Sequence, residues 1–404
     1  MLKWIMLMIY LLLCGYVLGH LLCAVSLLDH EHRRKAAVWI ILFLVLAVSV
    51  FPGRFLHKSD AAAALVRFGN YWLGMLIYLV FFLFSADIFL LVRKLARHLL
   101  GIHQTGFYTE KEGYILAAVV VCASALLFIY GCEHQKKLTI SEHDITIEKS
   151  AGTRKTLEMV LIADLHLGYS VGCDDMERMV EKINEEPTDI VILAGDIFDN
   201  DFDTLDDPQR LMEILGGIKS SLGVYAVYGN HDVRETLVGG FSISAAADAY
   251  RDPRMDEFMK GCGITVLEDE RVLPDGTFWL LGRLDGEKNG YGTMQRKTLQ
   301  ELTTGVDTGL PFFVINHEPD ELSEYAEYGV DVLLSGHTHA GQFFPLTLSQ
   351  PFAWKNSWGV KKIGNMYSIV TSGVGLYGPP LRVGTDSEIV RVHVEFTGDE
   401  SSGK

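Results

Sequence analysis

Five short polar clusters, each placed directly after an apolar run, constrain this chain more than any other feature. They are Asp164-Leu165-His166, Gly195-Asp196, Gly229-Asn230-His231-Asp232, Asn316-His317 and Gly336-His337-Thr338-His339. Apolar runs of this length are typical of buried strands. The carboxyl ends of neighbouring strands meet at one edge of an open α/β sheet, so we expect the five clusters to converge there. Each cluster supplies an oxygen or an imidazole nitrogen, and the sequence therefore predicts one site rich in metal-binding donors.

Charge divides the 404 residues into two parts. Residues 1–140 hold 13 Lys and Arg against 7 Asp and Glu, a balance of +6, whereas the remainder holds 22 against 44, a balance of −22. An acidic second part argues against nucleic-acid binding through a basic face. It also suggests that bound cations, rather than the general field, attract any anionic substrate. The cysteines of this part, Cys173 and Cys262, show no paired spacing that would indicate a disulfide or a thiolate zinc site.

The first part is predicted to contain membrane-spanning helices. Its apolar stretches cover roughly residues 4–28, 36–51, 68–92 and 113–131. Three approach or exceed the roughly 20 residues that span a bilayer, and the second is near the lower limit of about 17. The first run is too long for a typical signal-peptide core, so an uncleaved helix is favoured. We therefore predict a membrane domain over residues 1–137 with about four transmembrane helices, followed by a catalytic domain over residues 138–404.

The distribution of basic residues gives an orientation. The loops between spans one and two and between spans three and four carry seven Lys and Arg near the spans, against six on the opposite side. The excess places those two loops in the cytoplasm and the catalytic domain outside it. An ionisable residue inside a span is a candidate for a functional role. For Asp87, in the third span, the simpler expectation is pairing with Arg93 or Lys94 at the interface.

Beyond residue 137, strands and helices alternate. Helical spacing covers residues 174–184 and 205–218. Strands are expected over residues 138–148, 157–163, 189–194, 224–228, 264–267, 278–281, 312–315, 330–334, 367–371 and 389–396. The later half is so rich in strands that two facing sheets flanked by helices fit better than one doubly wound sheet.

The chemistry of the clusters supports a shared site. In Asp164/His166 and in His337/His339 the donors are two residues apart, so on an extended backbone both side chains face the same way. Five of the six histidines in residues 151–404 lie in the clusters. The carboxylate of Asp196 has two oxygens and suits a bridge between two cations.

The Gly-Asn-His-Asp cluster adds groups that can move a proton. Asn230 offers a carbonyl oxygen as a ligand, and His231 can donate a proton. Asp232 could orient His231 or raise its pKa. For Asp199 and Asn200, which follow Asp196 closely, loop capping is the better interpretation.

Taken in order, these clusters resemble the signature of the calcineurin-like metallophosphoesterase superfamily, over about residues 150–396. Residues 163–168, 335–342 and 372–378 look like its membrane-associated bacterial phosphohydrolase branch. The resemblance implies an α/β fold, a four-layer sandwich of two facing sheets flanked by helices, here after an N-terminal helical membrane region. It also implies a role for each donor. Asp164, His166 and His339 would bind a first metal, Asn230, His317 and His337 a second, and Asp196 both, while His231, supported by Asp232, would protonate the leaving oxygen.

The implied reaction is hydrolysis by a metal-bridging hydroxide that attacks phosphorus in line. The mixed donors fit two divalent ions of manganese, iron or zinc, with manganese favoured because the bacterial relatives commonly use it. We expect a membrane-anchored enzyme that cleaves phosphodiester or pyrophosphate bonds, and the tether favours a lipid-linked or nucleotide-lipid substrate. The alternatives are a phosphomonoesterase of soluble substrates and a non-catalytic membrane sensor or scaffold.

Overall fold

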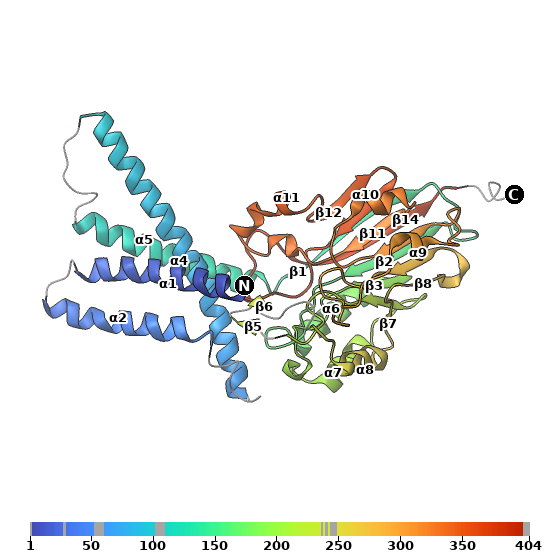
Figure 1. Ribbon diagram of the computed structural model, residues 1–404, viewed down its shortest axis with the longest axis horizontal. Coiled ribbons are helices and arrows are strands. Elements are labelled where there is room, and N and C mark those ends of the chain that lie inside the picture. Colours follow the sequence, from blue (N-terminus) through green and yellow to red (C-terminus); the bar gives the residue numbers. More distant parts are fainter. Residues whose placement is uncertain are drawn as a thin grey trace. The chain divides into compact units, whose positions relative to one another are not determined.

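The computed structural model describes residues 2–26, 30–51, 60–101, 110–235, 237–238, 241–242 and 249–398 (Figure 1). The chain divides into two compact units. The first comprises residues 1–133, 237–243 and 378–381, and the second comprises residues 134–236, 244–377 and 382–404.

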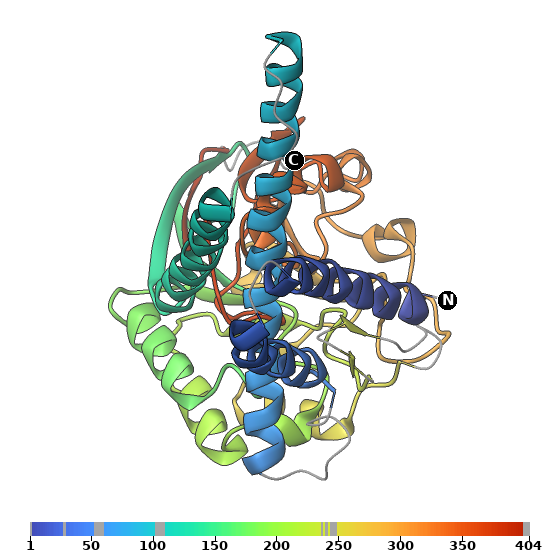
Figure 2. The same cartoon turned by 90° about the vertical axis from the view of Figure 1, so that its left-hand side faces the viewer.

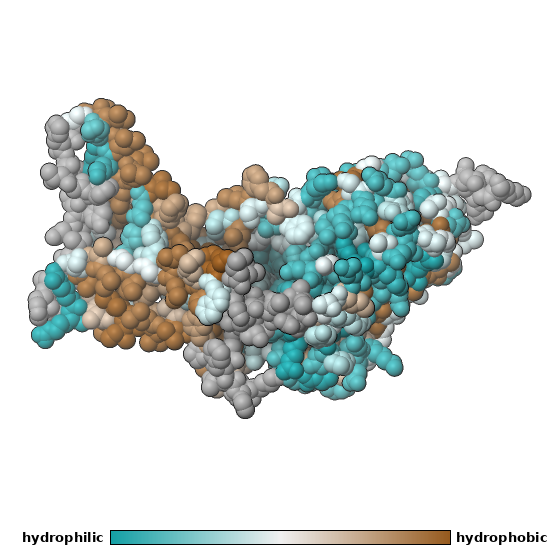
Figure 3. Space-filling model, in the orientation of Figure 1, coloured by the Kyte–Doolittle hydropathy of each residue, from teal (hydrophilic) through white to brown (hydrophobic). Residues whose placement is uncertain are grey.

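Long helices make up most of the first unit. They are α1 (Leu2–Ser26), α2 (His30–Val48), α4 (Asp60–Leu99) and α5 (Glu110–His134), and α1 lies beside α2 and α4 (Figures 1 and 2). The unit also contains a short hairpin of β5 (Leu237–Val238) and β6 (Phe241–Ser242). Their exposed side chains are mostly apolar, as the predominance of brown on the face seen in Figure 3 shows, and this is typical of helices in a lipid environment.

Three of these helices are long and apolar enough to cross a membrane, over Trp4–Ser26, Ala61–Leu99 and Lys111–His134. Helix α2 is shorter, with 19 residues, and opens on the charged sequence His-Glu-His-Arg-Arg-Lys. Because these charges occupy its first turns, the described part of α2 does not qualify as a span, and the second predicted crossing stays a prediction.

Asp87 in α4 has partners that the sequence did not suggest. Its Oδ2 accepts a hydrogen bond from the Tyr16 hydroxyl at 2.6 Å and lies 3.1 Å from Nε2 of His20, both on α1. Arg93, one of the two predicted partners, instead donates to Glu112 on α5. The carboxylate of Asp87 therefore joins two helices of the unit.

Two six-stranded sheets form the second unit. The first has the order β1-β14-β2-β3-β4-β7 and the second the order β12-β13-β11-β10-β9-β8. The strands of the first sheet are β1 (Leu138–Ile147), β2 (Thr156–Ile162), β3 (Ile190–Ala194), β4 (Val224–Val227), β7 (Thr265–Val266) and β14 (Ser387–Phe396). Those of the second are β8 (Glu270–Val272), β9 (Trp279–Gly282), β10 (Phe312–Ile315), β11 (Val332–Ser335), β12 (Gly359–Ile363) and β13 (Met366–Val370). Within the first sheet β2, β3 and β4 run parallel, and within the second sheet β9, β10, β11 and β13 run parallel.

Helices cover the outer face of each sheet. Helices α6 (Cys173–Asn184), α7 (Pro208–Leu215) and α8 (Pro253–Gly261) pack on the first sheet, and α9 (Leu299–Thr303) and α10 (Leu322–Glu327) pack on the second. Successive residues of a strand enter different cores, as the period of two requires. In β10, for example, Phe313 lies in the core between the sheets, whereas Phe312 packs under α9 and α10. The result is helix, sheet, sheet, helix, and the predicted four-layer sandwich is confirmed.

This topology gathers the polar clusters. Strands β2, β3, β4, β10 and β11 each end two or three residues before the first metal donor of a cluster, at Ile162, Ala194, Val227, Ile315 and Ser335. Within each sheet these strands run parallel, so their carboxyl ends lie at one edge of that sheet. The loops of the two sheets meet there, since the His337 N–H after β11 donates to the Asp164 carboxylate after β2.

Candidate metal centre

The loops that carry the donors leave their strands through left-handed turns. Asp164 and His166 have φ of 54° and 47°, and His337 and His339 have φ of 69° and 48°. The extended backbone expected for these two pairs is therefore wrong. A left-handed conformation is uncommon outside glycine and persists only where the surroundings fix it. Here the loops hold one another, since the Asp164 carboxylate accepts the His337 N–H at 3.0 Å and the His166 N–H donates to the Asp196 carbonyl at 3.0 Å.

Two glycines allow this close approach. A Cβ at Gly229 would lie 2.4 Å from Oδ1 of Asp196, and one at Gly336 would lie 2.7 Å from Oδ2 of Asp164. Any other residue at either position would displace a carboxylate of the site.

The first donor set joins Asp164, His166 and His339, all of which are buried. The Nε2 atoms of the two imidazoles are 3.1 Å apart, and Nε2 of His339 lies 3.8 Å from Oδ1 of Asp164. Neighbouring donors around a cation at about 2.1 Å are separated by about 3 Å, so the spacing suits a small divalent ion.

The second donor set joins Asp196, His317 and His337, with Asn230 beside them. Nε2 of His317 lies 3.1 Å from Oδ2 of Asp196, and Nδ1 of His337 lies 3.0 Å from Oδ1 of Asn230 and 3.3 Å from Nε2 of His317. Nδ1 of His317 is 2.7 Å from the Ala194 carbonyl oxygen. That contact places the proton on Nδ1 and leaves Nε2 as the ligand atom, which is the usual arrangement behind a metal-binding imidazole.

Asp196 lies between the two sets. Its Oδ2 is 3.1 Å from Nε2 of His317 and 3.7 Å from Nε2 of His166, and its Oδ1 accepts the His231 N–H at 2.8 Å. The side chain is buried and held on both sides. This is the position that a carboxylate shared by two cations would occupy.

The electrostatics fit cations at both places. Burial lowers the pKa of His337 to about 3, so this imidazole is neutral and has a free lone pair. Burial also works to raise the pKa of Asp196, but the imidazoles of His317 and His231 outweigh it and hold that pKa well below its usual range. Burial raises the pKa of Asp164 to about 6. Buried carboxylates this close repel each other and compete for protons, and divalent cations would replace those protons.

The group that orients His231 differs from the sequence interpretation. Nδ1 of His231 lies 3.0 Å from Oδ1 of Asn200. The Asn200 amide nitrogen donates to Glu235 at 3.1 Å, which turns its oxygen toward the imidazole. The carboxylate of Asp232 instead accepts the N–H groups of Phe198 and Gly229, both at 2.7 Å. Asn200, interpreted from sequence as a loop cap, thus takes the place expected for Asp232, whose carboxylate shapes the loop.

Sequence reasoning also missed the groups behind and beside His231. Glu235 forms a buried ion pair with Lys288, with 3.1 Å between Oε1 and Nζ, so a polar network runs from His231 through Asn200 to Lys288. The Tyr377 ring lies 4.7 Å from the His231 ring. Lys288 stands in a polar, glycine-rich loop without a local motif, and Tyr377 stands in residues 372–378, whose resemblance to the family branch assigned no role to this tyrosine.

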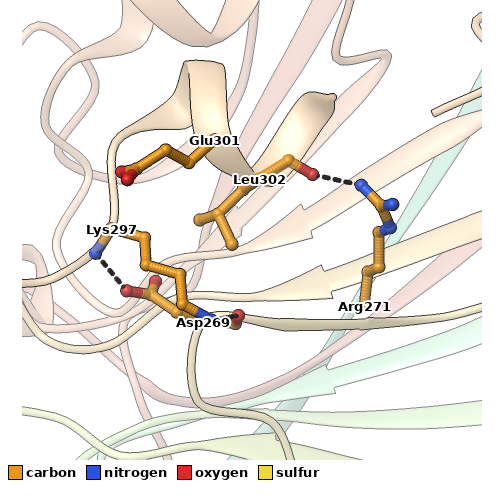
Figure 4. Close-up of a pocket in the computed structure, with 5 residues that line it drawn as sticks. All are labelled: Asp269, Arg271, Lys297, Glu301 and Leu302. Atoms are coloured by element: carbon orange, nitrogen blue, oxygen red, sulfur yellow. Dashed lines mark hydrogen bonds between the residues drawn. The ribbon is translucent and has the colours of Figure 1, made fainter. Parts of the chain in front are cut away.

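A separate hollow of about 420 Å³ is lined by Asp269, Arg271, Lys297, Glu301 and Leu302 (Figure 4). Its polar groups are satisfied within the protein. The Asp269 carboxylate accepts the Lys297 N–H and pairs with Arg283, both at 2.6 Å, and Arg271 donates to the Leu302 carbonyl at 2.6 Å. None of the predicted metal ligands lines this hollow, and its contacts are those of a structural junction between β8 and α9.

Comparison with known proteins agrees with the geometry. The profile of the calcineurin-like phosphoesterase family matches residues 158–341. A transmembrane protein with a metallophosphoesterase domain from Danio rerio is 28% identical over 389 residues, which cover 92% of this chain and 83% of that protein. An uncharacterized metallophosphoesterase from Campylobacter jejuni is 24% identical over 97% of this chain and 98% of its own length. Another from Aquifex aeolicus is 30% identical over 65% of this chain and 94% of its own length. The chain therefore belongs to the calcineurin-like phosphoesterase family, and it is a metal-dependent phosphoester hydrolase joined to apolar, membrane-type helices.

Proposed function

We propose that this protein is a membrane-anchored, dinuclear-metal phosphohydrolase that cleaves phosphodiester or pyrophosphate bonds. The observation that carries the proposal is the position of Asp196, which lies within 3.1–3.7 Å of an imidazole from each donor set. Two cations that share a carboxylate are about 3.5–4 Å apart, the separation that in-line displacement at phosphorus requires.

The donor residues divide between two cations, for which we propose manganese ahead of iron or zinc. Asp164, His166 and His339 would hold one, Asn230, His317 and His337 the other, and Asp196 both. When bound, such a pair lowers the pKa of a water and offsets charge on the phosphate oxygens. The chain supplies the rest of the chemistry. Ala194 fixes the tautomer of His317, and Asn200 holds His231 where we propose that its Nε2 gives a proton to the departing oxygen.

The membrane helices favour a substrate that is itself in the membrane, such as a lipid-linked phosphodiester or a nucleotide-lipid pyrophosphate. Phosphomonoester hydrolysis on soluble substrates is the alternative. The grouping of Asp164, His166 and His339, and of Asp196, His317 and His337 with Asn230, supports a catalytic role over a purely non-catalytic sensor or scaffold, which has no need for so many donors.

We further propose that the catalytic unit lies outside the cytoplasm, as the Lys and Arg near the spans favour. The side of the catalytic unit depends on whether α2 crosses the membrane. With four crossings the catalytic unit lies on the same side as the N-terminus, and with three crossings it lies on the opposite side. Labelling of Lys260, which is exposed on α8, with a membrane-impermeant amine reagent in intact cells tests the proposal, and protection of Lys260 would reverse the assignment.

The experiment for the reaction class uses the full chain in detergent, stripped of metal and reloaded with manganese. Hydrolysis of bis-p-nitrophenyl phosphate is expected to exceed that of p-nitrophenyl phosphate. A clear preference for the monoester would replace the diesterase proposal by the monoesterase alternative. An absence of turnover on both, with metal bound, would favour a binding role.

A further inference from the structure

Residues 343–358, which follow the loop of His337 and His339, expose a run of large apolar side chains. This segment contains the 3-10 turn η5 (Leu346–Leu348) and the short helix α11 (Gln350–Ala353). Leu346, Leu348, Phe352 and Trp358 are 50%, 63%, 91% and 58% exposed. Brown and tan side chains gather over α11 in Figure 3, whereas teal predominates over the rest of the second unit. Single exposed apolar residues are ordinary, but such a group marks an interaction surface.

The residues around this segment carry only positive charge, whereas the second unit as a whole is acidic. No acidic residue occurs between Asp331 and Asp386, although residues 141–404 hold 44 acidic residues against 22 basic ones. The same stretch contains Lys355, Lys361 and Lys362, all exposed. In the part of the chain that the structure describes, no carboxylate pairs with them. Their nitrogens contact the Ser323 hydroxyl, the Lys355 carbonyl and the Tyr367 ring.

The segment is fixed directly to the metal-binding loop. The hydroxyl of Thr338, between His337 and His339, donates to the Ser357 carbonyl at 2.6 Å, and the Trp354 ring lies 5.2 Å from the His337 ring. The buried amide of Asn356 donates to the carbonyls of Gly359 and Ser368. These contacts hold the segment with its exposed apolar side chains next to the second donor set.

The occupant that fits this surface is a lipid bilayer. Leucine, phenylalanine and tryptophan beside lysines are the composition of segments that lie in the headgroup region of anionic membranes. The chain's own apolar helix α5 would also hold the second unit close to a bilayer. Residues 135–137 alone separate α5, a helix long and apolar enough to span, from β1, and three residues reach at most about 11 Å.

We propose that residues 343–358 insert their apolar side chains into the headgroup region of an anionic phospholipid bilayer, and that the substrate is a phosphate-bearing lipid taken from that surface. The lysines attract the anionic headgroups, and the contacts of Thr338 with Ser357 and of Trp354 with His337 place the inserted segment beside the second donor set. This inference rests on the proposed function, since it supplies the substrate class for the same metal centre.

Photocrosslinking tests the insertion. Full-length protein in vesicles of phosphatidylcholine and phosphatidylglycerol carries benzoylphenylalanine at position 352, or at position 273 as a control, where Leu273 is also exposed but lies outside the segment. A lipid adduct is expected at position 352 and not at position 273. Reversal of charge in Lys361→Glu with Lys362→Glu is expected to reduce the adduct. The absence of a lipid adduct, or an adduct to a second copy of the chain, would overturn the proposal.

Kinetics separate this inference from the proposed function. Leu348→Glu with Phe352→Glu is expected to lower hydrolysis of a phosphodiester lipid in those vesicles by about tenfold or more, because two apolar anchors are lost, and to leave bis-p-nitrophenyl phosphate turnover unchanged. The milder Leu348→Ser serves if the double variant does not fold. Equal loss on both substrates, or equal retention on both, contradicts the inference. An inactive wild-type protein contradicts the proposed function instead.

Discussion

Replacement of Gly229 by alanine adds one methyl group and should disable the metal centre. The new Cβ would lie 2.4 Å from Oδ1 of Asp196, 2.6 Å from Cδ2 of His317 and 2.7 Å from the Asp196 backbone nitrogen. Ordinary contact begins at 3.4 Å, so the Asp196 oxygen would have to move by about 1 Å, the difference between 3.4 and 2.4 Å. Rotation of one side chain cannot relieve the overlap, because a backbone atom is also too close.

The size of the effect follows from that displacement. Metal sites tolerate about 0.2 Å in ligand distance, and a misplacement of 1 Å costs about a hundredfold in rate. We therefore expect Gly229→Ala to lower manganese affinity and turnover by about a hundredfold, while overpacking costs about 1–3 kcal/mol in the free energy of unfolding. Metal binding is measured by equilibrium dialysis and turnover with bis-p-nitrophenyl phosphate.

Gly309→Ala is the matched control. Its Cβ would meet only the Asp307 carboxyl group, with Oδ1 at 3.1 Å and Cγ at 3.9 Å, in an exposed turn where that side chain can move. We expect wild-type metal binding and turnover. If Gly229→Ala also bound two metal ions with wild-type affinity and kept wild-type turnover, the close packing of Asp196 against His317 would be irrelevant to the site, and the reasoning would be refuted.

Three other substitutions test separate parts of the account. Asp196→Ala should lose metal and activity together, whereas His231→Ala should keep both metal ions and lose about 10²–10⁴-fold in turnover, and metal analysis beside kinetics distinguishes the two. Asn200→Ala removes the contact at 3.0 Å that orients His231, so turnover should fall by about 10–100-fold with metal retained, and an unchanged rate would return the orienting role to Asp232. Arg382→Met leaves three buried carbonyls without the donor that now serves them at 2.8–3.0 Å, and urea unfolding should show a loss of about 3 kcal/mol or more.

Much of the fold could be predicted because its central strands are buried on both faces. The runs that became β3 and β10 are continuously apolar, and their expected positions, 189–194 and 312–315, agree with Ile190–Ala194 and Phe312–Ile315. The observed helix boundaries depart further from the expected ones. The helix expected over 205–218 covers only Pro208–Leu215, because Asp207 caps it and Pro208 sets its first turn.

The donor residues could be predicted because each follows a strand, but the way they meet could not. The left-handed turns at Asp164 and His337 are imposed by contacts between loops more than 170 residues apart in sequence, such as the carboxylate of Asp164 with the His337 N–H. The exchange of roles between Asn200 and Asp232 has the same cause. Adjacency in sequence favoured Asp232, while the fold brings Asn200, 31 residues away, to the His231 ring.

If two metal ions held by this site make the protein a phosphohydrolase, its activity must follow the occupancy of the site. Metal-stripped protein in detergent is titrated with manganese, and bound metal and hydrolysis of bis-p-nitrophenyl phosphate are measured on the same samples. We expect no turnover without metal and a rate that reaches its plateau when two ions are bound per chain. Full turnover in the stripped protein, or no turnover with two ions bound, would contradict this expectation.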